Sequence, residues 1–127
     1  AAESAKKIAT FNSQELTNTA WAFATAGVAA PALFEAVAAE SSKKIAMFVP
    51  QALANTVWAY ATMGIEAPAL FEAVAAVAPK KIAKFDSQAL SNTVWAYATM
   101  GIEAPALFEA VAAVAPKKIA TFKPQAL

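Results

Sequence analysis

The chain has 127 residues, the length of a single domain, and its ten lysines and nine acids give a formal net charge of +1. It has no cysteine and no histidine, which excludes disulfides, thiol catalysis and an ordinary zinc or copper site. Hydrophobic residues make up 59% and can bury a core, while the small net charge does not steer the chain strongly to nucleic acid or membrane.

One stretch, residues 45–65, has no charged side chain and is long enough to span a bilayer. It also contains Pro50, Gln51, Asn55 and Gly64, which are costly in lipid, so we expect no membrane span. The first ten residues lack the apolar segment of a signal peptide.

A repeat of 37 residues organises the chain. The tryptophans and glycines all follow this spacing, at Trp21, Trp58 and Trp95 and at Gly27, Gly64 and Gly101. We place full repeats at 11–47, 48–84 and 85–121, the end of a repeat at 1–10 and the start of one at 122–127. A period of this size is typical of solenoids and arrays, and we expect the segment to be part of a longer array.

The first half of each repeat has the period of an α-helix of about 14 residues. In the third repeat Asp86 or Ser87 can cap the start, and Gly101 suits the left-handed position after the end. The expected apolar face consists of Leu90, Val94, Tyr97 and Ala98.

The second half of each repeat predicts another helix, which opens with a proline suited to the first turn, such as Pro105. We place Glu109 near the first turn and the lysine pair near the last turn, both favourable for the helix dipole. Pro79 and Pro116 predict a kink, or a break into two short helices. The expected apolar face consists of Leu107, Phe108, Val111 and Ala115.

These elements predict an all-α fold, an α-solenoid of stacked helix-turn-helix hairpins, right-handed, with first helices on one face and second helices on the other. No polar capping repeat closes either end of the array. We therefore expect apolar end faces that bind protein partners or further repeats.

The sequence offers little to support catalysis, and we expect no enzyme, no metal and no cofactor. Glu35, Glu72 and Glu109 recur a whole repeat apart, so they form a ladder and not a converging site. We interpret them as first-turn acids that interact with the helix dipole. No phosphate-binding loop or glycine fingerprint is present.

Two further ladders each have two interpretations. The lysine pairs, Lys43 and Lys44, Lys80 and Lys81, Lys117 and Lys118, can contact successive RNA phosphates or can form a solvated helix end, and we favour the helix end. The tryptophan ladder can stack on bases or pack between repeats, and we favour packing.

A polar row on the first helices is more informative. Gln and Asn four residues apart are neighbours on one helix face, and their amides can pair with base edges. A variable position, Thr17, Ala54 or Ser91, lies beside them. The alternative, that the asparagines cap a loop or bridge neighbouring helices, stays equally open.

The pattern F-x-P/S-Q-x-L-x-N-T-x-W-A-F/Y-A-x-x-G, followed by P-x-L-F-x-A, resembles the heptatricopeptide and octotricopeptide repeats along the entire chain. The resemblance implies an α-solenoid that binds single-stranded RNA in plastids or mitochondria, in organellar RNA metabolism or translation, without a nuclease of its own. A scaffold role in a large organellar complex is the alternative. By position, the implied RNA face is Gln14, Thr17, Asn18, Gln51, Ala54, Asn55, Gln88, Ser91 and Asn92.

Overall fold

The computed structural model describes residues 7–118, and every regular element in that range is helical, as expected for an all-α chain. Its α-helices are α2 (Ser13–Ala26), α3 (Pro31–Lys44), α4 (Pro50–Met63), α5 (Pro68–Lys81), α6 (Ser87–Met100) and α7 (Pro105–Lys118). Two short 3₁₀ helices, η1 (Ile45–Met47) and η2 (Ile82–Lys84), follow α3 and α5. The partial repeat expected at 122–127, and most of that at 1–10, lie outside the described residues.

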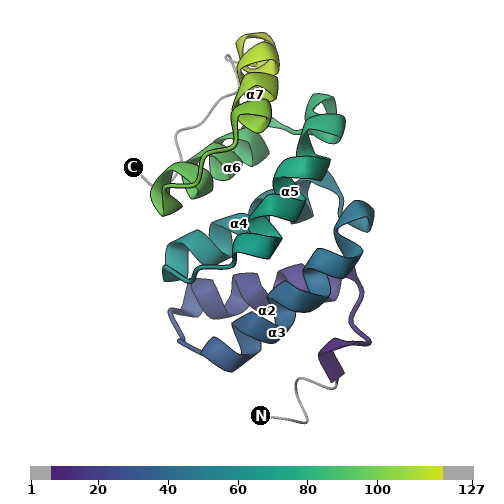
Figure 1. Cartoon of the computed structure of the whole chain (residues 1–127), viewed down its shortest axis with the longest axis vertical. Helices are drawn as coiled ribbons and strands as arrows, with labels where there is room; N and C mark the ends of the chain where they lie inside the picture. The colour runs from purple at the N-terminus through teal and green to yellow at the C-terminus, as the bar shows by residue number, and fades with distance from the viewer. Residues whose placement is uncertain (1–6, 119–127) are drawn as a thin grey trace.

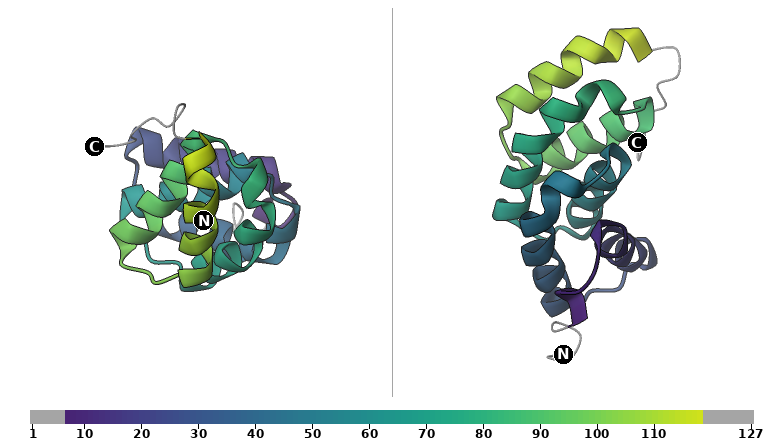
Figure 2. Two further views of the ribbon diagram at one scale, coloured as in Figure 1. Left: turned by 90° about the horizontal axis from the view of Figure 1, so that it is seen from above. Right: turned by 90° about the vertical axis from the view of Figure 1, so that its right-hand side faces the viewer.

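The helices form two layers (Figure 1). One layer contains α2, α4 and α6, here called the A helices, and the other contains α3, α5 and α7, the B helices. Within each layer the middle helix packs against both neighbours, and the A helices approach one another more closely than the B helices do. The resulting stack is longer than it is wide (Figure 2).

The A helices begin and end as their sequences predict. Asn12 and Glu15 form a reciprocal capping box at the start of α2, and the Asp86 side chain accepts from Ala89 N–H at the start of α6. Each A helix has 14 residues and ends at a glycine with φ between 66° and 68°, a left-handed conformation in which a side chain would be strained.

Each B helix opens with proline in its first turn, but the break expected at the internal proline lies elsewhere. Helix α5 continues through Pro79, and the change to 3₁₀ geometry comes at Ile82. Helix α3 changes at the equivalent residue, Ile45, although Ser42 takes the place of the proline. A break at the proline is therefore wrong, because a repeat without the proline changes geometry at the same place, while the alternative of a kink at Pro79 stays a prediction.

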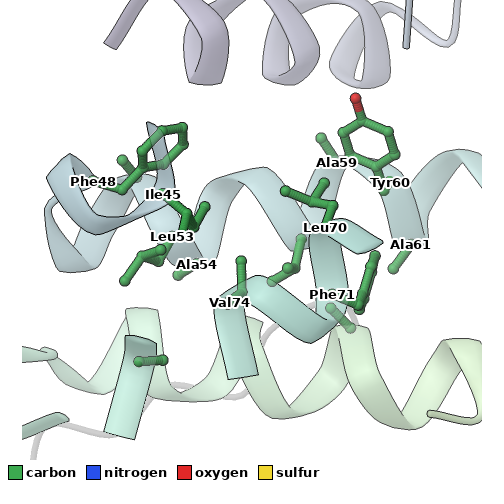
Figure 3. Close-up of a cluster of buried hydrophobic side chains, with 14 of the residues drawn as sticks. Ile45, Phe48, Leu53, Ala54, Ala59, Tyr60, Ala61, Leu70, Phe71 and Val74 are labelled. Atoms are coloured by element: carbon green, nitrogen blue, oxygen red, sulfur yellow. The ribbon is translucent and has the colours of Figure 1, made fainter. Parts of the chain in front are cut away.

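Alanines and large apolar residues share the core between the layers. Figure 3 shows the central part, where Leu53 and Tyr60 of α4 lie among Leu70, Phe71 and Val74 of α5. The small side chains of Ala54 and Ala59 are completely buried and allow the A helices to approach closely. On α6 the expected apolar face is confirmed for Leu90 and Tyr97, whereas Val94 is half-buried and Ala98 is exposed.

A tyrosine joins each helix pair to the pair before it. The Tyr60 hydroxyl donates to the carbonyl oxygen of Phe34 at 2.5 Å, and the Tyr97 hydroxyl donates to Phe71 at the same distance. The Phe34 and Tyr60 rings meet edge to face, with centroids 5.1 Å apart. Burial raises the pKa of both tyrosine hydroxyls well above the ordinary value.

The C-terminal B helix lacks this partner within the described residues. The Phe108 side chain is 37% exposed, whereas Phe34 and Phe71 are each 1% exposed. Among the described residues of α7, the Phe108 ring is thus an exposed apolar surface. None of the described helices has both the length and the hydropathy that a bilayer-spanning segment requires.

Candidate functional site

Packing leaves one narrow strip of helix α4 uncovered. In the body of α4, between residues 51 and 62, every side chain is buried except Gln51, Asn55, Trp58 and Thr62. Their spacing of four, three and four residues places them on one helix face. We call this face, with its equivalents on α2 and α6, the A-layer strip. Its other members are Gln14, Asn18, Trp21 and Thr25, and Gln88, Asn92, Trp95 and Thr99.

The glutamine and asparagine of the strip form a side-chain pair. The Gln51 amide nitrogen Nε2 donates to Asn55 Oδ1 at 3.0 Å, and Gln88 Nε2 donates to Asn92 Oδ1 at 3.1 Å. On α4 this bond fixes both amides and leaves Gln51 Oε1 as an acceptor beside the Asn55 NH₂ donor. An adjacent acceptor and donor match the edge of an unpaired base.

The variable position beside this row lies between the A helices instead of at the surface. Thr17, Ala54 and Ser91 are 4%, 0% and 9% exposed. The Thr17 hydroxyl lies 3.1 Å from the Thr56 hydroxyl of the next A helix. These three residues of the expected RNA face therefore contact protein, because α4 packs between α2 and α6 and covers the facing side of each.

Exposure of the asparagines differs along the strip. Asn18 is exposed, Asn55 is half-buried, and Asn92 is 6% exposed. Gln14 and Gln51 are exposed, whereas Gln88 is half-buried. The part of the strip on α2 and α4 is therefore the part that the structure leaves accessible to a ligand.

The tryptophans belong to the same strip. Trp21 is 44% exposed, and Trp58 and Trp95 are half-buried against the core. Packing between repeats therefore accounts for only part of the tryptophan ladder. The Trp58 ring turns its Nε1 inward, where this nitrogen is buried and has no hydrogen-bond partner.

The two lysines of each pair have different environments. The second lysine donates to main-chain carbonyl oxygens of the preceding linker: Lys44 Nζ to Ala9 and Phe11, and Lys81 Nζ to Ala46 and Phe48, at 2.7–3.1 Å. Lys118 Nζ donates in the same way to Ala83 and Phe85. The first lysine of each pair, Lys43, Lys80 or Lys117, is exposed.

The second lysine of each pair is therefore a structural residue that joins its helix to the preceding linker. Our interpretation of the pairs as solvated helix ends holds only for the first lysine. Of the six lysines considered for phosphate contact, Lys43, Lys80 and Lys117 are the ones with their charge at the surface.

A basic groove lies at the glutamine end of the strip. It encloses about 370 Å³ between the linkers that precede α4 and α6 and is lined by Met47, Val49, Lys80 and Lys84, among others. Met47 and Val49 are 65% and 60% exposed. The first turn of α4 has no side-chain cap, so its N–H groups add positive potential at this end of the strip.

The three repeated glutamates lie on the B helices, away from the A-layer strip. Glu35, Glu72 and Glu109 are exposed at the fifth position of their helices, one residue beyond the first turn where we expected them. Among residues 7–118 no three His, Cys, Asp or Glu side chains come together in a way that would hold a metal ion.

An apolar groove separates α3 from α5 in the B layer. It encloses about 460 Å³, and its lining includes Phe34, Ala38 and Leu70 with Glu35 and Glu66. This groove reflects the wider spacing of the B helices and lies on the layer opposite to the A-layer strip.

Comparison with known families matches residues 1–127 to the RNA-editing substrate-binding complex 6 protein family. The chain belongs to this family. None of the curated proteins compared with it matches. The family name refers to RNA editing, in agreement with the association with RNA that the resemblance implied, but the match does not specify heptatricopeptide or octotricopeptide repeats.

In this member of the RNA-editing substrate-binding complex 6 family, sequence reasoning missed two kinds of residue. Lys84 lies outside the lysine pairs, yet it lines the basic groove. The tryptophans were assigned to packing because large aromatic residues usually supply buried area. Their spacing of three from the strip asparagines, as in Asn55 and Trp58, is the signal that places them on the same helix face.

Proposed function

We propose that the chain is a non-enzymatic module of an RNA-editing substrate-binding complex, and that it binds single-stranded RNA along the A-layer strip. The observation that carries the proposal is the exposed Gln51–Asn55 pair, held by its own hydrogen bond next to a lysine-lined groove. Amide pairs of this kind can pair with base edges, and lysines can neutralise the phosphates between them.

The helix arrangement supports an α-solenoid of 37-residue repeats as the frame for this module. The A helices lie closer together than the B helices, and this difference favours a stack that curves towards the A layer with the A-layer strips on its inner side. A continuous inner surface suits a single extended strand. By resemblance to organellar helical repeats, we place the protein in a plastid or a mitochondrion, as a single segment of a longer array.

Fluorescence anisotropy with labelled single-stranded RNA pools, at low and at physiological salt, tests the proposal. We expect saturable binding that weakens with salt, by about 0.7 in log K per tenfold salt for each phosphate contacted. Replacing Asn18 and Asn55 together by Ala removes accessible amides without touching the buried Asn92, so it should weaken binding and preserve helicity. Absence of binding at both salts, from a folded sample, would refute the proposal.

A protein scaffold is the second candidate, and the apolar groove between α3 and α5 favours it. The acidic side chains of Glu35 and Glu66 at the groove suit a basic, amphipathic partner segment. The exposed Phe108 offers a further apolar contact at α7. Binding through such a surface would survive physiological salt, whereas phosphate binding would weaken steeply.

A further inference from the structure

We propose that Trp21, Trp58 and Trp95 are base-stacking platforms, one for each A helix, so that the module selects unpaired RNA with little regard to sequence. The inference rests on the proposed RNA-binding function. It goes further by naming the side chains that hold the bases and the class of RNA that fits them.

The positions of the tryptophans carry the inference. Each lies on the A-layer strip, three residues after the asparagine and four before the threonine. Trp58 and Trp95 are half-buried against the core, so each of these two rings is anchored on one side and open on the other, whereas Trp21 is 44% exposed on α2. A ring anchored in this way has lost most of its rotational freedom and can receive a base without much further ordering.

The surroundings of the rings select among possible ligands. The amide pair lies next to the ring on the same strip, and the lysine groove lies beyond the amides at the start of α4. A strand with one base on the tryptophan and the phosphate of a neighbouring nucleotide towards Lys80 and Lys84 meets an aromatic face, an amide pair and positive charge in that order. An apolar peptide would not use the amide pair or the lysines.

The same arrangement limits base specificity. Every base has a π-face, so stacking on tryptophan tolerates any sequence. The strips of α4 and α6 carry the same four residue types, and the variable Ala54 and Ser91 are buried between helices. Neighbouring A helices therefore have no means to demand different bases. Bases within a duplex are already stacked, so the rings favour single strands.

The first experiment measures RNA binding and tryptophan emission together on the full chain. The three tryptophans are the only ones in the sequence, so their fluorescence reports on the strip alone. We expect emission to be quenched in proportion to the RNA bound, with homopolymers of all four bases differing by less than about tenfold in affinity. A strand of the same length with abasic sites should bind at least about fivefold more weakly than the intact strand.

Variants then separate stacking from fold. Trp21→Leu changes the most exposed ring and should weaken binding about fivefold or more, whereas Trp21→Phe should retain most of the affinity because it keeps an aromatic face. Phe108→Leu is the matched control: its ring is also exposed, at 37%, but it lies on a B helix outside the strip, so RNA binding should not change. Circular dichroism and thermal melting confirm that each variant is folded.

The outcomes distinguish this inference from the function on which it rests. RNA binding without quenching, unchanged in Trp21→Leu and equal for abasic strands, would overturn the stacking platforms and leave the RNA-binding function standing. Absence of any RNA binding from the folded chain would overturn both. A preference for duplex over single strands would also overturn the stacking proposal.

Discussion

The hydroxyl of Tyr60 joins two helix pairs, and Tyr60→Phe removes that single oxygen without opening a cavity as large as a methyl group. The hydroxyl donates to the Phe34 carbonyl at 2.5 Å, and the side chain is completely buried. Phe34 lies in the body of α3, so after the substitution its carbonyl oxygen still accepts the main-chain hydrogen bond of the helix. The expected loss is therefore that of one net hydrogen bond, about 1 kcal/mol of unfolding free energy.

Urea unfolding followed by circular dichroism measures this loss. We expect Tyr60→Phe and Tyr97→Phe each to lower the unfolding free energy by about 1 kcal/mol, and the melting temperature by about 4 °C. Phe23 occupies the equivalent position on α2, and Phe23→Tyr is the matched control, which should give no gain because no described B helix precedes it. Losses below about 0.3 kcal/mol in both variants would refute the view that these hydroxyls join the pairs.

The same two hydroxyls should make the unfolding free energy decrease at alkaline pH. Burial raises the pKa of both in the folded protein above the value of about 10 in the unfolded chain. Above that pH the unfolded chain releases protons that the folded protein retains, so the unfolding free energy falls as the pH rises. The wild type should lose more stability than the double Tyr→Phe variant between about pH 10 and pH 11. Parallel pH profiles would contradict this reasoning.

Three further predictions follow from the linkers and helix ends. Lys81→Met removes two hydrogen bonds to linker carbonyls and should lower the unfolding free energy in urea by about 1–2 kcal/mol. Lys80→Met should leave urea unfolding unchanged and make RNA binding less salt-dependent. Val49→Asp provides the side-chain cap that α4 lacks, so it should raise the unfolding free energy by about 1 kcal/mol while weakening RNA binding in the lysine groove. Gly64→Ala should lower the unfolding free energy by about 1–2 kcal/mol through backbone strain alone, because a Cβ atom there has open space around it. Gly64→Asn should lower it less, because asparagine adopts the left-handed conformation more readily. Equal losses for the two variants would indicate that packing is the cause.

Local features of the fold could be read from the sequence because their causes are local. The glycine after each A helix predicted the left-handed ending, and Gly101 has φ 66°. Asp86 predicted the helix start and caps it. The all-helical fold likewise follows from the apolar period. The change of geometry after α3 and α5 could not be read from the proline, because it occurs at Ile45 and Ile82 whether or not the proline is present, next to lysines that bind carbonyls of a distant linker.

The candidate site was harder to predict because it depends on what surrounds each helix. A single apolar stripe is the usual expectation for a surface helix. Helix α4 instead packs against α2, α6 and α5, so three sides are covered and only one strip stays open. This crowding buries Ala54 beside the expected RNA row and leaves Trp58 at the edge of the open strip.

Each junction between neighbouring helix pairs uses the same two links, a tyrosine hydroxyl on a B-helix carbonyl and a lysine on linker carbonyls. The faces that meet at one junction therefore match the faces that meet at the next. Unequal recombination that duplicates or deletes 37 codons would join matching faces and alter the length of the helix stack without requiring a new core. An insertion of another length within a helix would displace the tyrosine or the lysine from its carbonyl, whereas one in an exposed loop would be tolerated.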